Sequence, residues 1–358
     1  MRERRRACNI KSFIRVCQRR RPSFTASVSI RQRLRLKPHA PSTPRAFARR
    51  LAILTIVAVL LALAAPRPAA AQTLNPEPVA PEVYAFVGAL AEPAPENRGF
   101  VANQGFIVGD TGVIVIDTGA SHAHGEAMLA AIRRVTDKPV VLVINTHPGA
   151  ERVLGNSAFA ALGVPILAHR DAARFMAANC RTCLENLNTV LGEALMAGTT
   201  IAAPTALVDG TTTLKIAGRT LEVLHFGWTR AGDVAVFDRA SGALFTGDLV
   251  CLDRVPQVRD AHLDNWLAAL EALRRLPIRV LVPGRGPISS PQRITEVQTY
   301  LEDLRAAVQA RYDRGDSLSE AIDNASVHAF RGWALYPLLH PGNVHHLYLE
   351  LERQALER

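Results

Sequence analysis

Short apolar, β-branched runs alternate with helix-like patterns between Phe100 and Val250, and this alternation strongly limits the folds open to the chain. Runs of this kind, bounded by polar or glycine-rich loops, are typical of buried strands. Strands are predicted at 105–108, 113–117, 140–145, 165–168, 221–226, 234–237 and 244–246. Helices are predicted at 125–135, 153–162, 172–178 and 184–196. The pattern indicates an α/β fold whose helices cover the faces of the sheets.

The composition becomes helical after Pro283, where apolar residues recur at spacings of three and four. Helices are predicted at 290–312, 318–324 and 333–351, with Trp333, Tyr336 and Tyr348 as core anchors. The predicted organisation is a basic leader and signal peptide at 1–71, an N-terminal segment at 72–99, the main α/β domain at 100–290 and a C-terminal helical extension at 291–358.

The basic charge of the chain is concentrated at its beginning. The chain has 42 Lys and Arg against 32 Asp and Glu, but 17 of the basic residues and only one acid precede Gln72. The remaining 25 basic and 31 acidic residues carry a net charge of about −6. The folded part of the chain is therefore not expected to bind nucleic acid.

The leader has the pattern of an export signal. Arg49 and Arg50 precede an apolar run from Leu51 to Ala65, which is interrupted only by Thr55 and followed by small residues up to Ala71. As a helix this run rises only about 22 Å, less than the roughly 30 Å of a hydrocarbon core. We expect cleavage after Ala71, no permanent membrane span, and a periplasmic or secreted protein.

Three cysteines remain after the leader, and export would place them in an oxidising compartment. Cys180 and Cys183 form a CxxC element, for which a structural disulfide is the favoured interpretation. A redox-active pair and half of a zinc site are the alternatives. Cys251 is expected to stay free or buried.

Polar loops follow three of these predicted strands and a further strand end at 280–282, in chain order. They are Asp117-Thr118-Gly119, the segment from Thr146 to Arg152, Thr246-Gly247-Asp248, and the segment from Pro283 to Pro287. This order resembles the metallo-β-lactamase superfamily, and the continuation into C-terminal helices resembles the quinoprotein relay system zinc metallohydrolases. The resemblance implies a four-layer αβ/βα sandwich with a two-zinc site at its open edge. It gives Asp117 and Gly119 the role of a structural loop.

Most metal ligands of that family are replaced in this chain. The family pattern His-x-His-x-Asp-His places His147, Gly149, Glu151 and Arg152 at the first four ligand positions. Thr229 falls where a later ligand His is expected, and Arg285 replaces the His of a Pro-Gly-His-Gly loop. Only His147 and Asp248 keep the ligand type, which predicts at best a weak single-metal site.

The two arginines suggest a substitute for the metal. A guanidinium is always charged and is suited to bind carboxylates. We therefore expect Arg152 and Arg285 to pair with Asp248 and Glu151 in a partly buried pocket. Of the other histidines, His122 and His124 are expected to be solvated loop residues before a helix that begins at Gly125.

The sequence thus predicts an exported protein of metallo-β-lactamase fold in which hydrolysis has been lost and binding remains. The expected partner is a small anionic ligand or a periplasmic protein, with no cofactor, and the resemblance implies a link to pyrroloquinoline quinone dehydrogenase systems. One alternative is a zinc-dependent hydrolase with unconventional ligands such as Glu151 or His122. The other is a periplasmic thiol/disulfide protein that acts through Cys180 and Cys183.

Overall fold

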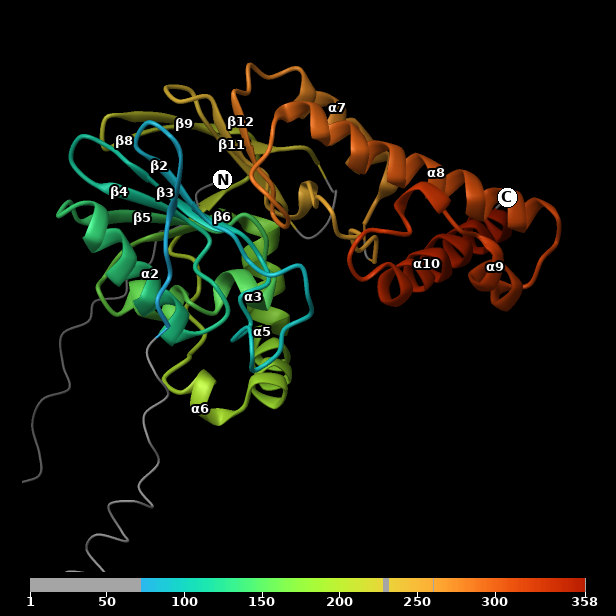
Figure 1. Cartoon of the computed structure of the whole chain (residues 1–358), viewed down its shortest axis with the longest axis horizontal. Helices are drawn as coiled ribbons and strands as arrows, with labels where there is room; N and C mark the ends of the chain where they lie inside the picture. Colours follow the sequence, from blue (N-terminus) through green and yellow to red (C-terminus); the bar gives the residue numbers. More distant parts are fainter. Residues whose placement is uncertain (1–71, 228–231, 260, 358) are drawn as a thin grey trace, which may run out of the picture. The chain divides into compact units, whose positions relative to one another are not determined.

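The computed structural model describes residues 72–227, 232–259 and 261–357, which belong to one compact unit from Pro68 to Arg358. Two sheets lie at its centre (Figure 1). The first has the order β1 (Glu77–Ala80), β2 (Val83–Phe86), β3 (Gln104–Val108), β4 (Val113–Ile116), β5 (Val140–Ile144), β6 (Ile166–His169) and β7 (Ala206–Val208). The second has the order β12 (Val280–Val282), β11 (Ala243–Phe245), β10 (Val234–Asp238), β9 (Arg219–His225) and β8 (Thr212–Ile216).

Both sheets are mixed. Strands β1 to β4 pair antiparallel, whereas β4 to β7 pair parallel, and in the second sheet only β11 and β12 are parallel among the named pairs. Residues 72–99 supply β1 and β2, so the predicted N-terminal segment forms one side of the larger sheet. The leader and the signal-peptide prediction lie outside the described residues.

The helices lie outside the two sheets. On the side of the first sheet are α2 (His122–Val135), α3 (Ala150–Val153), α4 (Asn156–Ala160), α5 (Arg170–Leu191) and α6 (Glu193–Met196). The later helices are α7 (Leu263–Arg274), α8 (Ile294–Asp313), α9 (Leu318–Asn324) and α10 (Tyr336–Leu356). Three short 3-10 helices are η1 (Gly247–Leu249), η2 (Pro291–Arg293) and η3 (His328–Phe330).

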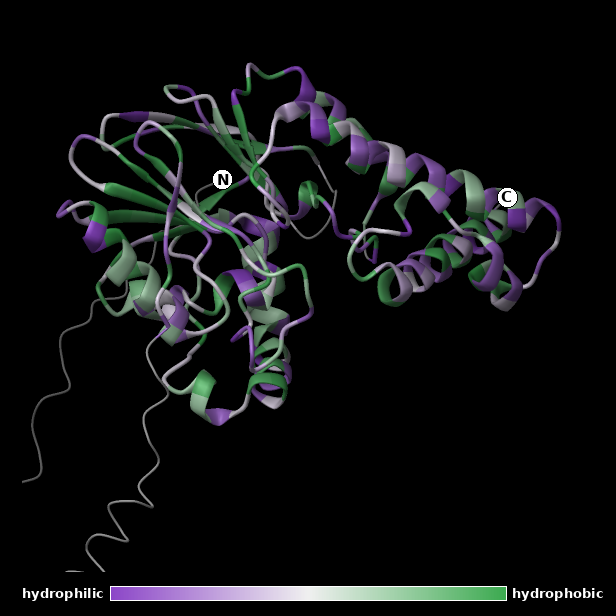
Figure 2. Cartoon of the chain, in the orientation of Figure 1, coloured by the Kyte–Doolittle hydropathy of each residue, from purple (hydrophilic) through white to green (hydrophobic). Residues whose placement is uncertain are grey.

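Strand β4 shows why the layers stack as they do. Its four residues are all buried, which is typical of a strand covered on both faces. Because side chains alternate across a sheet, Val113 and Val115 pack with the helices α2 and α4, whereas Ile114 and Ile116 pack against the second sheet. Figure 2 shows the strands of both sheets as mainly hydrophobic and the helices as mixed. The predicted four-layer αβ/βα sandwich is confirmed.

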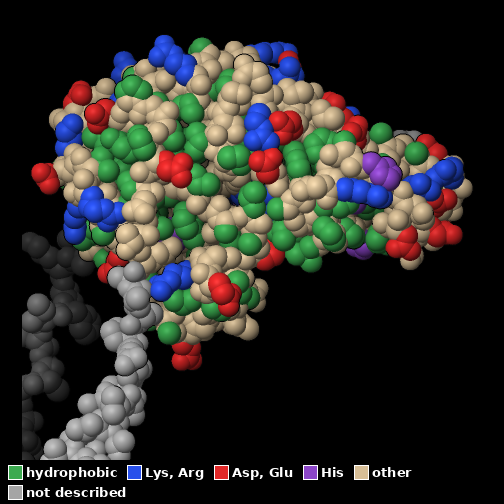
Figure 3. All heavy atoms as spheres, in the orientation of Figure 1, with side chains coloured by type: hydrophobic (Ala, Val, Ile, Leu, Met, Phe, Trp, Pro, Cys, Tyr) green, Lys and Arg blue, Asp and Glu red, His purple; other side chains and the backbone are tan. Residues whose placement is uncertain are grey.

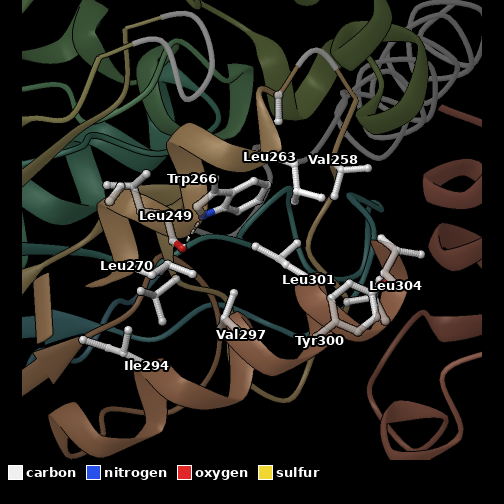
Figure 4. Close-up of a cluster of buried hydrophobic side chains, with 14 of the residues drawn as sticks. Leu249, Val258, Leu263, Trp266, Leu270, Ile294, Val297, Tyr300, Leu301 and Leu304 are labelled. Carbon is white, nitrogen blue, oxygen red and sulfur yellow. Dashed lines mark hydrogen bonds between the residues drawn. The ribbon is translucent and has the colours of Figure 1, made fainter. Parts of the chain in front are cut away.

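A third apolar cluster joins the outer face of the second sheet to the C-terminal helices. Figure 4 shows Trp266 of α7 facing Leu301 and Val297 of α8, and the Trp266 Nε1–H donates to the Leu249 carbonyl at 2.9 Å. The predicted anchors Tyr336 and Tyr348 are buried in this cluster, and the partly buried Trp333 packs against it. The helical extension is therefore packed continuously on the main domain.

Several predicted helix boundaries were wrong. The segments 172–178 and 184–196 belong mainly to the single helix α5, which ends at Leu191 before Gly192 with its positive φ of 84°. The predicted helix 153–162 is divided into α3 and α4. Helix α7 and the strands β1, β2, β7 and β8 were not predicted.

No helix within residues 72–227, 232–259 and 261–357 has the length and apolar character needed to cross a bilayer. Figure 3 shows acidic and basic side chains mixed over one face of these residues.

Candidate functional site

The predicted polar loops meet at one edge of the two sheets and are tied together by backbone hydrogen bonds. The Thr118 amide donates to the Arg152 carbonyl at 2.8 Å, and the Gly284 amide donates to the Val250 carbonyl at 2.9 Å. Asn103, from the loop before β3, links further segments through its side-chain amide, which donates to the carbonyls of Pro283 and Gly286 at 2.9 and 2.8 Å. Segments far apart in the sequence thus form one site.

Arg152 occupies the centre of this site. Its side chain is 0% exposed, with Nη1 3.0 Å from Asp117 Oδ2 and Nη2 paired with Asp248 Oδ1. The guanidinium also donates to the carbonyls of Asn103 and Gly284 at 3.2 and 2.9 Å. Burial acts to lower the pKa of Arg152, but Asp248 and Asp117 raise it above its ordinary value, so the residue stays charged.

Arg285 forms the second half of the network. Its Nη2 pairs with Glu151 Oε1, its Nε lies 3.4 Å from Asp248 Oδ1, and its Nη1 donates to the Val101 carbonyl at 2.7 Å. Burial acts to raise the pKa of Glu151, but Arg285, together with Arg152 and a backbone hydrogen bond, lowers it below its usual range. The predicted pairing of the two arginines with Asp248 and Glu151 is present.

Asp117 has a role that the sequence did not predict. It was expected to be part of a structural loop, yet its carboxylate is the second partner of Arg152 and also accepts hydrogen bonds from the Thr146 amide at 2.8 Å and the Thr146 hydroxyl at 2.6 Å. Burial raises the pKa of Asp117 despite these contacts. The carboxylate is held in the protein interior by groups that would be left unpaired without it.

His147 faces a partner that the sequence also did not identify. The His147 Nδ1–H donates to Asp233 Oδ1 at 2.5 Å, and both residues are buried. Asp233 immediately precedes β10 of the second sheet, whereas His147 follows β5 of the first. Thr229, the remaining former metal position, lies outside the described residues.

The residues present do not fit a two-zinc centre. Asp248 and Glu151 are already bound by arginine, and a guanidinium has no electron pair to donate to a metal. In residues 72–227, 232–259 and 261–357, no three His, Cys, Asp or Glu side chains form a group that could hold a metal ion. A cavity of about 10 Å³ lies beside Asp248, Cys251 and Arg285, which is room for about one water molecule.

Two of the other histidine predictions require correction. His122 and His124 lie inside α2, which begins before Gly125 because Ser121 caps it, and the His124 side chain is buried rather than solvated. The His124 ring packs edge-on to the Phe100 ring, with the ring centres 5.0 Å apart. Burial lowers the pKa of His124 to about 4. His169, the last residue of β6, stacks on His225 of β9 with ring centres 3.9 Å apart.

The CxxC element lies within α5 near the site. Cys180, Cys183 and Cys251 are free thiols, so the favoured disulfide between Cys180 and Cys183 is not formed in the structure. Both cysteines are in a regular helix, where β-carbons three positions apart are about 5–6 Å apart and a disulfide needs about 3.5–4.5 Å. Closing the bond therefore requires this turn of α5 to contract.

Comparison with known proteins places the chain in a family. A family model described as the metallo-beta-lactamase superfamily matches residues 97–285. The match covers more than half of the chain, and the protein belongs to the metallo-beta-lactamase superfamily.

Individual relatives differ in how much of the chain they match. A linear primary-alkylsulfatase from Pseudomonas sp. (strain ATCC 19151) is 24% identical over an alignment of 231 residues, and the match covers 55% of this chain and 44% of the relative. The chain thus spans less than half the length of this curated relative, which is an alkylsulfatase rather than a quinoprotein relay protein.

Solved structures with the same fold include a metallo-beta-lactamase from Pontibacter korlensis, with a TM-score of 0.53 and 23% identity over 64% of this chain and 99% of that one. A double mutant of the sec-alkyl sulfatase PisA1 has a TM-score of 0.59 and 17% identity over 78% of this chain and 50% of that one. At these identities the likeness shows the fold alone.

Proposed function

We propose that this protein is a non-hydrolytic member of the superfamily that acts as an accessory or ligand-binding protein. The observation that carries the proposal is the burial of Arg152 between Asp117 and Asp248, at a position where the family pattern has a metal-binding His. A permanent cation on the chain itself neutralises carboxylates that a metal ion would otherwise hold. The former active site then acts as a structural ion-pair network.

The ligand contact is proposed at Arg285, on the outer part of this network. Glu151 is the more exposed of the carboxylates, with 18% of its side chain accessible, whereas Asp248 has 8%. An anionic ligand would therefore reach the site by exchanging with Glu151 at Nη2 of the Arg285 guanidinium, because Nη1 and Nε already face the Val101 carbonyl and Asp248. The ligand is a small anion or an acidic group on a periplasmic protein.

Export and a link to quinoprotein dehydrogenase systems belong to the same proposal. Both derive from the sequence: the first from the leader pattern, the second from the resemblance to the quinoprotein relay proteins. Export would place the binding protein in the periplasm or outside the cell, and the link would make a quinoprotein dehydrogenase system its partner. The proposed binding at Arg285 does not depend on either prediction.

A second candidate is a metal-dependent hydrolase of sulfate esters. It is favoured by the sequence similarity to the linear primary-alkylsulfatase. Such an enzyme would need His147 and Asp248 together with unconventional ligands such as Glu151 or His122. His122 instead contacts Ser157 at 3.1 Å and Glu126 at 3.6 Å.

An activity assay separates the two candidates. The purified protein is incubated with a primary alkyl sulfate and, separately, with a β-lactam, in the presence of added zinc or of a chelator, and sulfate release or ring opening is followed. We expect no turnover above the buffer rate in either condition. Turnover that the chelator abolishes would establish the hydrolase and refute the non-hydrolytic proposal.

A further inference from the structure

The two thiols of the CxxC element are arranged as an exposed and a buried partner. Cys180 and Cys183 are three positions apart on α5, so their side chains lie on one face of the helix. Cys180 is 0% exposed and packs with Val153 of α3 and Met176 of α5. Cys183 is partly exposed. Only Cys183 can therefore meet a partner molecule directly.

We propose that Cys180 and Cys183 form a thiol–disulfide exchange site, in which Cys183 attacks an incoming disulfide and Cys180 resolves the mixed disulfide. The substrate class is a small or protein-borne disulfide. The proposal concerns α5 and is independent of the binding function assigned to Arg285.

Hydrogen bonding between the thiols supports this division of roles. The side-chain hydrogen bond from Cys180 lowers the pKa of Cys183 to about 7, whereas the same bond and burial raise the pKa of Cys180. Cys180 therefore keeps its proton and donates it towards the Cys183 sulfur. Because the thiolate is the nucleophile, Cys183 is reactive near neutral pH while Cys180 is protected until a mixed disulfide forms.

The exchange balances without a further oxidant. The Cys183 thiolate attacks one sulfur of a disulfide such as oxidised glutathione, so that a mixed disulfide forms and one glutathione thiolate leaves. Cys180 then loses its proton and attacks the Cys183 sulfur, which releases the second glutathione. The protein thiols are oxidised to one disulfide, the glutathione disulfide is reduced to two thiols, and the two protein protons pass to them.

Cys251 provides a contrast within the same chain. It is buried, and burial together with the nearby Asp248 raises the pKa of Cys251 to about 11. Its sulfur makes a weak hydrogen bond to the Asp248 carbonyl at 3.9 Å. We therefore expect Cys251 to remain a thiol under conditions that oxidise the pair on α5.

The position of Arg181 makes the disulfide directly observable. Trypsin cleaves after Arg174, Arg181 and Lys215, so Cys180 and Cys183 fall on separate peptides, 175–181 and 182–215. The folded, reduced protein is treated with oxidised glutathione, free thiols are blocked, and the digest is analysed by mass spectrometry. We expect the two peptides to be joined, to separate on reduction, and to leave the Cys251 peptide blocked as a free thiol.

Two further measurements locate the roles. In the parent, alkylation at pH 7 is expected to modify Cys183 about tenfold faster than Cys251, since only Cys183 is accessible and acidic. Cys180→Ser should retain one glutathione on Cys183, and Cys183→Ser should retain none on Cys180.

Peptides that stay separate in the parent, or equal alkylation rates for Cys183 and Cys251, would overturn the proposal. These readouts use the unaltered protein, so they decide the question even if the Cys180→Ser variant does not fold. If that variant folds, as its thermal midpoint will show, absence of glutathione on Cys183 would also overturn it.

Discussion

Arg152 and Asp248 form a buried ion pair at the point where the loops of both sheets meet. The arginine side chain has no accessible surface, and its second carboxylate partner, Asp117, is equally buried. A charge at this depth is tolerated only when its partners are in place, because removal of one partner leaves the other buried without compensation. This relationship leads to the first two predictions.

Removal of Arg152 should strongly destabilise the protein. Arg152→Met keeps much of the side-chain volume but leaves Asp117 without its cation and Asp248 with only Arg285 at 3.4 Å, which we expect to lower the free energy of unfolding by about 3–5 kcal/mol. The matched control is Arg174→Met, because Arg174 is 72% exposed and its pair with Asp171 contributes at most about 1 kcal/mol. Urea unfolding of both variants measures the difference. Similar midpoints for the two would show that Arg152 does not hold the network.

Restoration of the family ligands should restore zinc binding. The variant Gly149→His, Glu151→Asp, Arg152→His, Arg285→His removes both guanidinium groups and leaves Asp248 and His147 to join the new ligands. An added Cβ at Gly149 would lie 3.0 Å from His147 Cδ2 and 3.1 Å from Glu151 Oε2, so these side chains must shift slightly, and Glu151→Asp shortens one of them.

The control for this variant keeps both arginines and carries only Gly149→His and Glu151→Asp. In the control, Arg152 still forms an ion pair with Asp248, which is then not free to bind a metal ion. We therefore expect the fourfold variant to bind zinc and the control to bind little. Zinc content is measured by mass spectrometry after dialysis. Equal zinc content in the two would contradict the proposed role of the arginines.

Stability should fall in mild acid because of His124. Burial lowers the pKa of His124 from 6.5 to about 4, so between these pH values the unfolded chain binds a proton that the folded chain does not. The contribution is complete above about pH 6.5 and is lost as the pH falls to 4, by roughly 3 kcal/mol. His124→Leu should flatten the fall in thermal midpoint over this range, while His345→Leu, at an exposed position, should not.

Gly119 should not tolerate a side chain. Its φ of 88° favours glycine, and an added Cβ would lie 2.1 Å from Cδ2 of the buried His124 ring. Gly163 has a similar φ of 73° but nothing within 4 Å, so Gly163→Ala should cost only the backbone strain of about 1–2 kcal/mol. We expect Gly119→Ala to cost about 2 kcal/mol more, because of the clash. Comparable unfolding free energies for the two variants would refute the packing described around His124.

The sheet architecture was predictable from the sequence because its strands are buried on both faces and therefore appear as continuous apolar runs, as in β4.

Helix α5 was less predictable from the sequence than the strands. Its buried residues Met176, Cys180, Leu187 and Leu191 are widely spaced, and the polar stretch between them suggested an interruption. The helix is continuous because these four residues still fall on one face.

The site was predictable only where a family pattern supplied the positions. That pattern placed Arg152 and Arg285 beside Asp248 and Glu151, and the structure has these pairs. The partner of His147 could not be inferred in this way, since Asp233 is 86 residues away and on the other sheet. Likewise, nothing in the local sequence distinguishes the buried His124 from an exposed histidine.

The central claim is that two arginines have replaced the metal ions of this family's site, and zinc stoichiometry tests it most directly. The protein is purified without chelators or affinity metal, dialysed against added zinc and then against metal-free buffer, and its metal content is measured by mass spectrometry. The account predicts a zinc content near zero per chain. One or two tightly held zinc ions per chain would contradict it.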